Sequence, residues 1–280
     1  IAPGNGDDSG SLRFSYTNPV LGLRWKLQPH WTLHASTARG FESPTLGELA
    51  YSADNSGFNF ALKGQTSRQF ELGSKWRSDS VDVDAALFLV NTANEIAVVA
   101  NSGGRSSFRN VDSTRRYGGE LSAAWRIAPG LRAQAALSLL HARYRNGYFT
   151  CAAVPCLTPT VEVAAGNRIA GTQARLGWFE LAWRPGIVAG ELGLELRGQS
   201  RTAANDTNKI FAPGHGLINL RWSHDWPLGD AATLRTLLRV DNLADRAYVG
   251  SVIVNAANDR VFETGSPRSA LVSLRLVRAF

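Results

Sequence analysis

The strongest constraint in this sequence is an alternation of apolar and polar residues that returns along nearly the whole chain. In 81–90, for example, Asp82 and Asp84 alternate with apolar residues. Successive side chains of a β-strand point to opposite faces, so each such segment has one apolar and one polar face. No segment of comparable length shows the spacing of an amphipathic helix, and the chain is therefore predicted to be all-β.

The length of the alternating segments separates the possible β architectures. Strands of soluble proteins are most often about 5–6 residues long, whereas a tilted strand needs about 9–11 residues to cross a bilayer. Most of the eleven segments reach that length. The sequence therefore predicts a transmembrane antiparallel β-barrel. Its predicted strands are 18–27, 31–39, 66–77, 81–100, 105–127, 131–145, 169–184, 187–200, 213–226, 231–254 and 267–280.

The connections between these segments alternate in length. Short turns stand at 28–30, 78–80, 128–130, 185–186 and 227–230. Mostly longer segments lie between them, at 40–66, 146–168, 201–212 and 255–266. Outer-membrane barrels have this arrangement, with short periplasmic turns and long extracellular loops. Six tryptophans near the short turns agree with it, because tryptophan is enriched at membrane interfaces; they are Trp25, Trp31, Trp76, Trp125, Trp183 and Trp226.

The odd number of strands suggests a piece of something larger. Single-chain bacterial barrels have an even number of strands. Either the first eighteen residues add a twelfth strand, in which Leu12, Phe14 and Tyr16 alternate, or further strands precede them. The chain begins with Ile1 rather than Met and shows no signal peptide. We therefore expect a processed chain or a fragment.

Two segments resemble a known family. Residues 38–49 read ARGFESPTLGEL, and this resembles the "GF-x-x-PT-x-x-EL" loop in the middle of the barrel of TonB-dependent outer-membrane receptors. Residues 239–248 read RVDNLADRAY; together with GSPR at 265–268 and a last strand ending in Phe280, they resemble the C-terminal end of those receptors. The resemblance covers nearly the whole chain.

The resemblance implies a fold and a function. The family forms a barrel of about twenty-two strands around a plug. Residues 1–280 would supply 11–12 of these strands as the C-terminal part, with the plug, the TonB box and the upstream strands outside the chain. The expected function is TonB-dependent import of a scarce ligand across the outer membrane of a Gram-negative bacterium. The expected partners are TonB, outer-membrane lipid and lipopolysaccharide.

The ligand implied by the resemblance is a ferric siderophore or a quinone cofactor. Segments 248–254 and 257–263 look like the branch that includes the pyrroloquinoline quinone receptor, which adds Asn258 and Arg260 to the candidates. No cofactor of the protein's own is expected. A basic cluster and loop aromatics complete the set of candidate ligand-binding residues: Arg105, Arg109, Arg115, Arg116, Phe41, Tyr51, Phe58, Tyr144 and Tyr148.

Both groups of candidates have an alternative role. Arginines can capture an anionic ligand through charge-assisted hydrogen bonds, or they can face the solvated lumen and the anionic headgroups of the outer leaflet. The aromatics can form a platform for a ligand, or they can pack the loops against one another.

The two cysteines, Cys151 and Cys156, share one long loop. Metal or redox chemistry would be the interpretation in a cytosolic protein. In an exported barrel a small disulfide is the expected outcome, because oxidation is permitted there.

Other functions find little support. The net charge of +7 comes with arginines scattered singly along the chain, which is unlike a nucleic-acid interface. The five histidines are dispersed, and neither an HExxH pair, a phosphate-binding loop nor a nucleophile elbow is present, so no catalytic or metal site and no enzyme is predicted. An autotransporter translocator would need a helix before its first strand, which residues 1–10 do not form, and a barrel enzyme would need a catalytic cluster at one rim.

Overall fold

The computed structural model describes residues 9–278, apart from 53–56, 103, 153–155, 157, 230 and 259. Phe280 and residue 259 of the segment 257–263, which entered the predictions above, lie outside the described residues, as do residues 1–8. The described part is built almost wholly of strands, with one short helix, α1 (Leu46–Leu49). No helix in it is long and apolar enough to cross a membrane.

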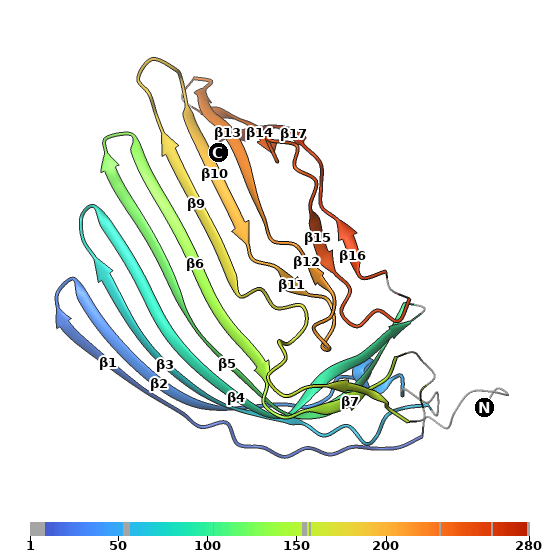
Figure 1. The fold of residues 1–280 in the computed structure, drawn as a ribbon. Helices are drawn as coiled ribbons and strands as arrows, with labels where there is room; N and C mark the ends of the chain where they lie inside the picture. The colour runs from blue at the N-terminus through green and yellow to red at the C-terminus, as the bar shows by residue number, and fades with distance from the viewer. Residues whose placement is uncertain are drawn as a thin grey trace.

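Eleven strands form one antiparallel sheet in which each strand pairs with its neighbours in chain order. Figure 1 shows the sheet as a curved, open trough, with short hairpin turns at one end and longer segments at the other. The predicted transmembrane-barrel strands are confirmed, with shifted ends. The strands are β1 (Val20–Gln28), β2 (Trp31–Glu42), β3 (Gln65–Arg77), β4 (Val81–Ser102), β5 (Arg105–Ala128), β6 (Leu131–Tyr144), β9 (Arg175–Trp183), β10 (Glu191–Gln199), β13 (His215–Pro227), β14 (Ala232–Asp241) and β17 (Ser269–Arg278).

The predicted strand 231–254 is too long, since β14 ends at Asp241. Asn242 and Asp245 have φ of 51°, a left-handed conformation that ends an extended strand. The buried Asn242 side chain holds the turn, because it donates to the carbonyl of Arg246 and accepts from the amide of Arg246, both at 2.9 Å. The DNLADR segment is therefore a structured turn.

Residues 9–19 form no strand. The alternation of Leu12, Phe14 and Tyr16 therefore does not supply a twelfth strand. Tyr16 instead stacks on Phe41 at the loop end of β2, with ring centroids 4.4 Å apart.

Three small hairpins lie in the loops: β7 (Tyr148–Thr150) with β8 (Val161–Val163), β11 (Thr202–Ala203) with β12 (Phe211–Ala212), and β15 (Val249–Val252) with β16 (Phe262–Thr264). Val111, Tyr144 and Val163 form a small buried core among them. The PT-x-x-EL motif begins α1: Thr45 and Glu48 form a capping box, in which the Thr45 hydroxyl accepts from the Glu48 amide and the Glu48 carboxylate accepts from the Thr45 amide.

The two faces of the large sheet differ in chemistry. The concave face carries a ladder of ion pairs across β6 to β14, in which the buried Glu191 accepts from Arg132, Arg184 and Arg221. The convex face carries leucines that remain exposed, such as Leu87. This is the polarity of a membrane barrel, with lipid outside and water or protein inside.

Candidate functional site

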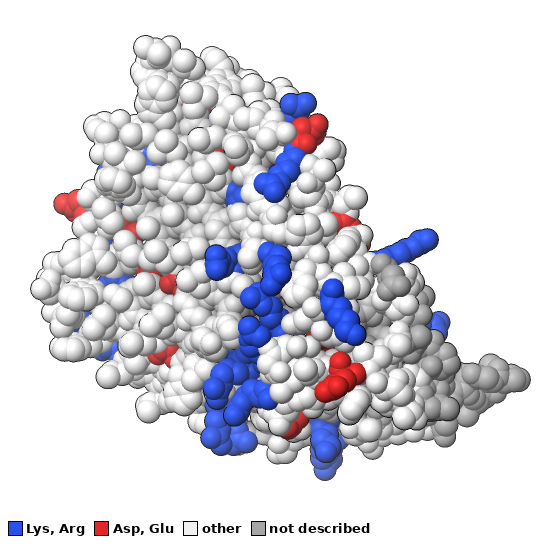
Figure 2. Space-filling view, in the orientation of Figure 1, with Lys and Arg blue, Asp and Glu red and all other residues white. Residues whose placement is uncertain are grey.

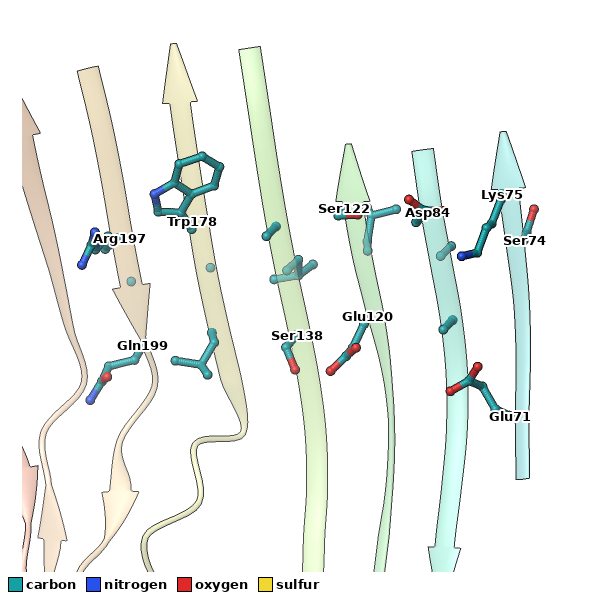
Figure 3. A pocket seen from close by; sticks show the side chains of 18 of the residues that line it. Glu71, Ser74, Lys75, Asp84, Glu120, Ser122, Ser138, Trp178, Arg197 and Gln199 are labelled. Carbon is teal, nitrogen blue, oxygen red and sulfur yellow. The ribbon is translucent and has the colours of Figure 1, made fainter. Parts of the chain in front are cut away.

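Two cavities are candidate binding sites, and the first lies on the concave face of the sheet. It has a volume of about 780 Å³. Figure 3 shows Lys75, Asp84, Glu120, Trp178 and Arg197 lining it from neighbouring strands. It forms part of the inner wall of the trough and combines these charged side chains with apolar ones such as Leu137.

The second cavity lies among the loops, with a volume of about 890 Å³. Its wall combines three aromatic rings, Phe58, Phe60 and Phe108, with the cations Lys63 and Arg109 and one carboxylate, Asp112. Aromatic rings can stack on a flat group of a ligand, and the cations can bind an anionic group. The loop cavity is therefore suited to an anionic ligand that contains a ring.

Asparagine side chains fasten the loop that carries Phe58, Phe60 and Lys63 to β5. Asn110 accepts from the Lys63 amide at 2.7 Å and donates to its carbonyl at 2.8 Å. Asn59 donates to the carbonyl of Phe108 at 3.0 Å. The cavity wall is thus held by hydrogen bonds between segments far apart in the sequence.

Cys151 and Cys156 form a disulfide bond, with Cα atoms 6.0 Å apart, and both line the loop cavity. The bond closes a short loop next to the cavity. Its contribution is therefore to local order in the wall.

Replacing both cysteines by serine should loosen this wall and leave the barrel strands intact. We expect faster hydrogen exchange at residues 150 and 151, with no change in the strand amides of β9 and β10, because the bond spans only the loop. Hydrogen exchange with mass spectrometry measures both. Faster exchange throughout the barrel would contradict a local role.

The predicted ligand residues are not all brought together. Phe58 and Arg109 line the loop cavity. Tyr51 does not line it but precedes Ser52, which does. The guanidinium of Arg105 lies over the Tyr51 ring, 4.9 Å from its centroid. These four residues form the part of the predicted set that clusters at the loops.

Arg115 and Arg116 lie on opposite faces of β5, as neighbours in a strand must. Arg116 makes an ion pair with the largely buried Glu95 on the concave face. Arg115 lies on the convex face, where its Nε donates to Asn91 at 2.8 Å. The predicted basic cluster is therefore divided, and neither arginine lines the loop cavity.

Tyr144 and Tyr148 pack with their ring centroids 5.0 Å apart. Tyr148 donates to the carboxylate of buried Asp206 at 3.1 Å. Burial, then the charge of Asp206, raises the pKa of the Tyr148 phenol well above its usual range. Tyr144 is only 3% exposed and offers no surface to a ligand. Phe41 stacks on Tyr16, so Phe41, Tyr144 and Tyr148 each pack against another aromatic ring at the loop end of the sheet.

Asn258 and Arg260 lie at the surface of the loop between β15 and β16. The Arg260 backbone amide donates a hydrogen bond to the Asn258 side chain at 3.1 Å. Neither lines one of the two cavities.

Sequence reasoning missed Lys63, Phe108 and Asn110 as residues of the loop cavity. Lys63 carried a weak signal, because it was a cation within the long loop 40–66. Phe108 and Asn110 carried none, because their role depends on a contact 47 to 49 residues away in the chain. Among the described residues, no group of three or more His, Cys, Asp or Glu side chains is placed to hold a metal ion.

Several solved transporter structures have this fold. The iron transporter FrpB from Neisseria meningitidis superposes with a TM-score of 0.65 at 20% identity, covering 92% of this chain and 38% of its own. The unliganded ferric citrate transporter FecA gives 0.71 at 18% identity, with 94% and 38% covered. The ferric preacinetobactin receptor BauA from Acinetobacter baumannii gives 0.64 at 16%, with 92% and 36% covered. The chain thus spans less than two fifths of these proteins.

The family comparison agrees with the fold. Residues 2–243 match the family model described as "TonB dependent receptor-like, beta-barrel". That match covers most of the chain and includes the capped α1 segment and all strands from β1 to β14. The chain therefore belongs to the family of TonB-dependent receptor β-barrels.

Proposed function

We propose that the protein is an outer-membrane receptor that imports a scarce ligand in a TonB-dependent manner. The support is family membership together with the polar concave and apolar convex faces of the sheet. TonB would act through a plug outside this chain, and outer-membrane lipid and lipopolysaccharide would surround the convex face.

The chain would be the C-terminal part of a larger barrel. In the described residues β1 and β17 each pair on one side only, so the sheet has two open edges. An open edge exposes unpaired backbone groups, which a bilayer does not tolerate, and a membrane barrel therefore closes. Further strands would close this one, around a plug that faces the concave cavity.

The observation that carries the ligand proposal is the loop cavity. It lies at the loop end of the sheet, where an extracellular ligand would arrive, and it pairs aromatic rings with Lys63 and Arg109. A ferric siderophore with anionic aromatic groups fits this wall, and so does pyrroloquinoline quinone, which carries several carboxylates on fused rings. The related structures are named for iron, ferric citrate and ferric preacinetobactin, which favours a ferric complex as the ligand.

Uptake by the full-length receptor tests the proposal. A deletion strain complemented with the receptor should grow on one class of ferric siderophore, or take up pyrroloquinoline quinone, only when TonB is present. Equal uptake without TonB would contradict the transport mechanism. A response to neither ligand class would overturn the ligand proposal.

Replacing Lys63 and Arg109 by glutamine should weaken ligand binding on the order of tenfold, because each replacement removes a charge-assisted hydrogen bond. Lys209→Gln is the matched control, since this exposed loop lysine does not line the cavity. Binding of the identified ligand to the purified full-length receptor measures the effect. An equal loss in Lys209→Gln would indicate general loop electrostatics instead of a site.

A further inference from the structure

Five arginines and one asparagine occupy a single row across the convex face, near the loop ends of β2, β3 and β6 and near the middle of the longer strands β4 and β5. Each residue of the row is the register partner of the next, and an isolated bridge adds the last one. The arginine row consists, in this order, of Arg39 (β2), Arg68 (β3), Asn91 (β4), Arg115 (β5), Arg143 (β6) and Arg168.

The row belongs to the apolar face. Arg68 and Arg115 are separated by two positions from the exposed Phe70 and Tyr117, and side chains two apart on a strand share a face. Figure 2 shows Lys and Arg side chains gathered in a band that crosses an otherwise largely uncharged surface. The arginines therefore border the surface assigned to lipid.

The charges of the row are not balanced within the protein. Arginines of the concave face have carboxylate partners, as Arg116 has in Glu95 and Arg132 has in Glu191. Within the described residues, none of the five arginines of the row makes an ion pair. Like charges directly opposite one another destabilise a sheet. Burial, together with Arg143, Arg201 and Arg175, lowers the pKa of Arg168, as expected where positive charge is in excess.

The depth of the row follows from the strand length. Trp31 and Trp76 are register partners near the turn end, and Arg39 and Arg68 are partners eight residues further along. Eight residues span ~27 Å along a strand, or ~21 Å across the membrane at a tilt of about 40°. An outer-membrane barrel has an apolar band about 25 Å tall. Arg39 and Arg68 therefore lie near the upper edge of the apolar band, next to the outer-leaflet headgroups. The row inclines with the tilt of the strands, so Arg115, ten residues from Trp125 on β5, lies further out toward the loops.

We propose that the arginine row is a binding site for the phosphate groups of the outer-leaflet glycolipid, lipopolysaccharide. Guanidinium groups bind phosphate through paired hydrogen bonds, and several in a row suit a headgroup with more than one phosphate. Bound phosphate neutralises the repulsion that the register creates. The inference rests on the proposed outer-membrane location and identifies where on the barrel that lipid partner binds.

The test uses the full-length receptor extracted from the outer membrane in mild detergent. Native mass spectrometry counts the lipopolysaccharide molecules that remain bound to Arg68→Gln/Arg115→Gln. Retention should fall on the order of tenfold relative to the parent, since two cations are removed at an anionic lipid surface. The matched control, Arg126→Gln/Arg235→Gln, removes two exposed arginines that pair with Asp82 and Asp225 instead, and should retain the parent amount.

Two further measurements follow. One tests whether the row variant is less stable, and the other tests whether free phosphate competes with the bound lipopolysaccharide. In detergent free of lipopolysaccharide, Arg68→Gln/Arg115→Gln should unfold at a temperature no lower than the parent, because the change relieves repulsion. Inorganic phosphate should not displace the bound lipid. Unchanged lipid retention in the row variant, or an equal loss in the control, would overturn the proposal. None of these readouts uses the transported ligand, so a wrong ligand assignment would leave the result intact.

Discussion

Leu194→Arg and Leu238→Arg should each lower the free energy of unfolding of the full-length receptor in a lipid bilayer by about 2–4 kcal/mol. Both leucines lie near the middle of their strands on the convex face, where they are 38% and 42% exposed. An arginine there replaces lipid-facing apolar surface with a charge that the hydrocarbon cannot solvate. Denaturant unfolding in lipid vesicles, followed by tryptophan fluorescence, measures the loss.

The matched control is Gln134→Arg on the concave face. Gln134 is exposed and is the register partner of Glu180, so an added guanidinium finds water and a carboxylate. We expect a change within about 0.5 kcal/mol, as for an ordinary surface substitution. Glu195 is unsuitable as a control, because its carboxylate accepts from Asn219, Arg197 and Arg239. Equal losses for Leu194→Arg and Gln134→Arg would show that the convex face does not contact lipid.

The arginine row offers a second comparison, between native arginines and introduced arginines on the same convex face. Arg115 lies on the same face as Leu121 and Leu87, yet closer to the loops. The cost of a charge on the lipid face depends on depth and falls to about 0–1 kcal/mol near the interface. The same residue type is therefore tolerated at one level of this face and destabilising at another.

The strands could be predicted because their signal is local. Alternation of apolar and polar residues is read within one segment, and all eleven strands of the sheet were found in this way. Their ends were harder: β14 stops at Asp241 because Asn242 and Asp245 adopt positive φ, while the apolar residues of 249–254 continue the pattern beyond the turn. Alternation alone cannot distinguish a long strand from two strands joined by such a turn.

The candidate site was predicted only in part, because loop contacts are not local. Arg115 and Arg116 were grouped by nearness in sequence, although adjacent residues of a strand face opposite ways. Tyr148 is held by Asp206, 58 residues away, and no pattern near either residue shows this pairing. The sequence motifs identified the family correctly, since residues 2–243 match the model of the TonB-dependent receptor β-barrel.

A second large effect is expected from Gly118→Ala, in the glycine pair Gly118 and Gly119 of β5. A Cβ atom at Gly118 would lie 1.9 Å from the carbonyl oxygen of Leu139 and 2.9 Å from the Phe88 ring. The first of these is backbone of the neighbouring strand β6, which moves only by disturbing its ladder with β5. We expect the free energy of unfolding to fall by about 2–3 kcal/mol.

Gly177→Ala provides the opposite case within the same sheet. Gly177 lies in β9, and a Cβ atom there meets nothing within 4 Å. Alanine restricts the unfolded chain more than glycine does, so this variant should gain about 0.5–1 kcal/mol. When both variants are unfolded under the same conditions, the close approach of β5 and β6 at Gly118 should therefore give changes in unfolding free energy of opposite sign. A small effect of the same sign in both would mean that these strands are further apart at Gly118, and that the paired glycines are not required by the barrel wall.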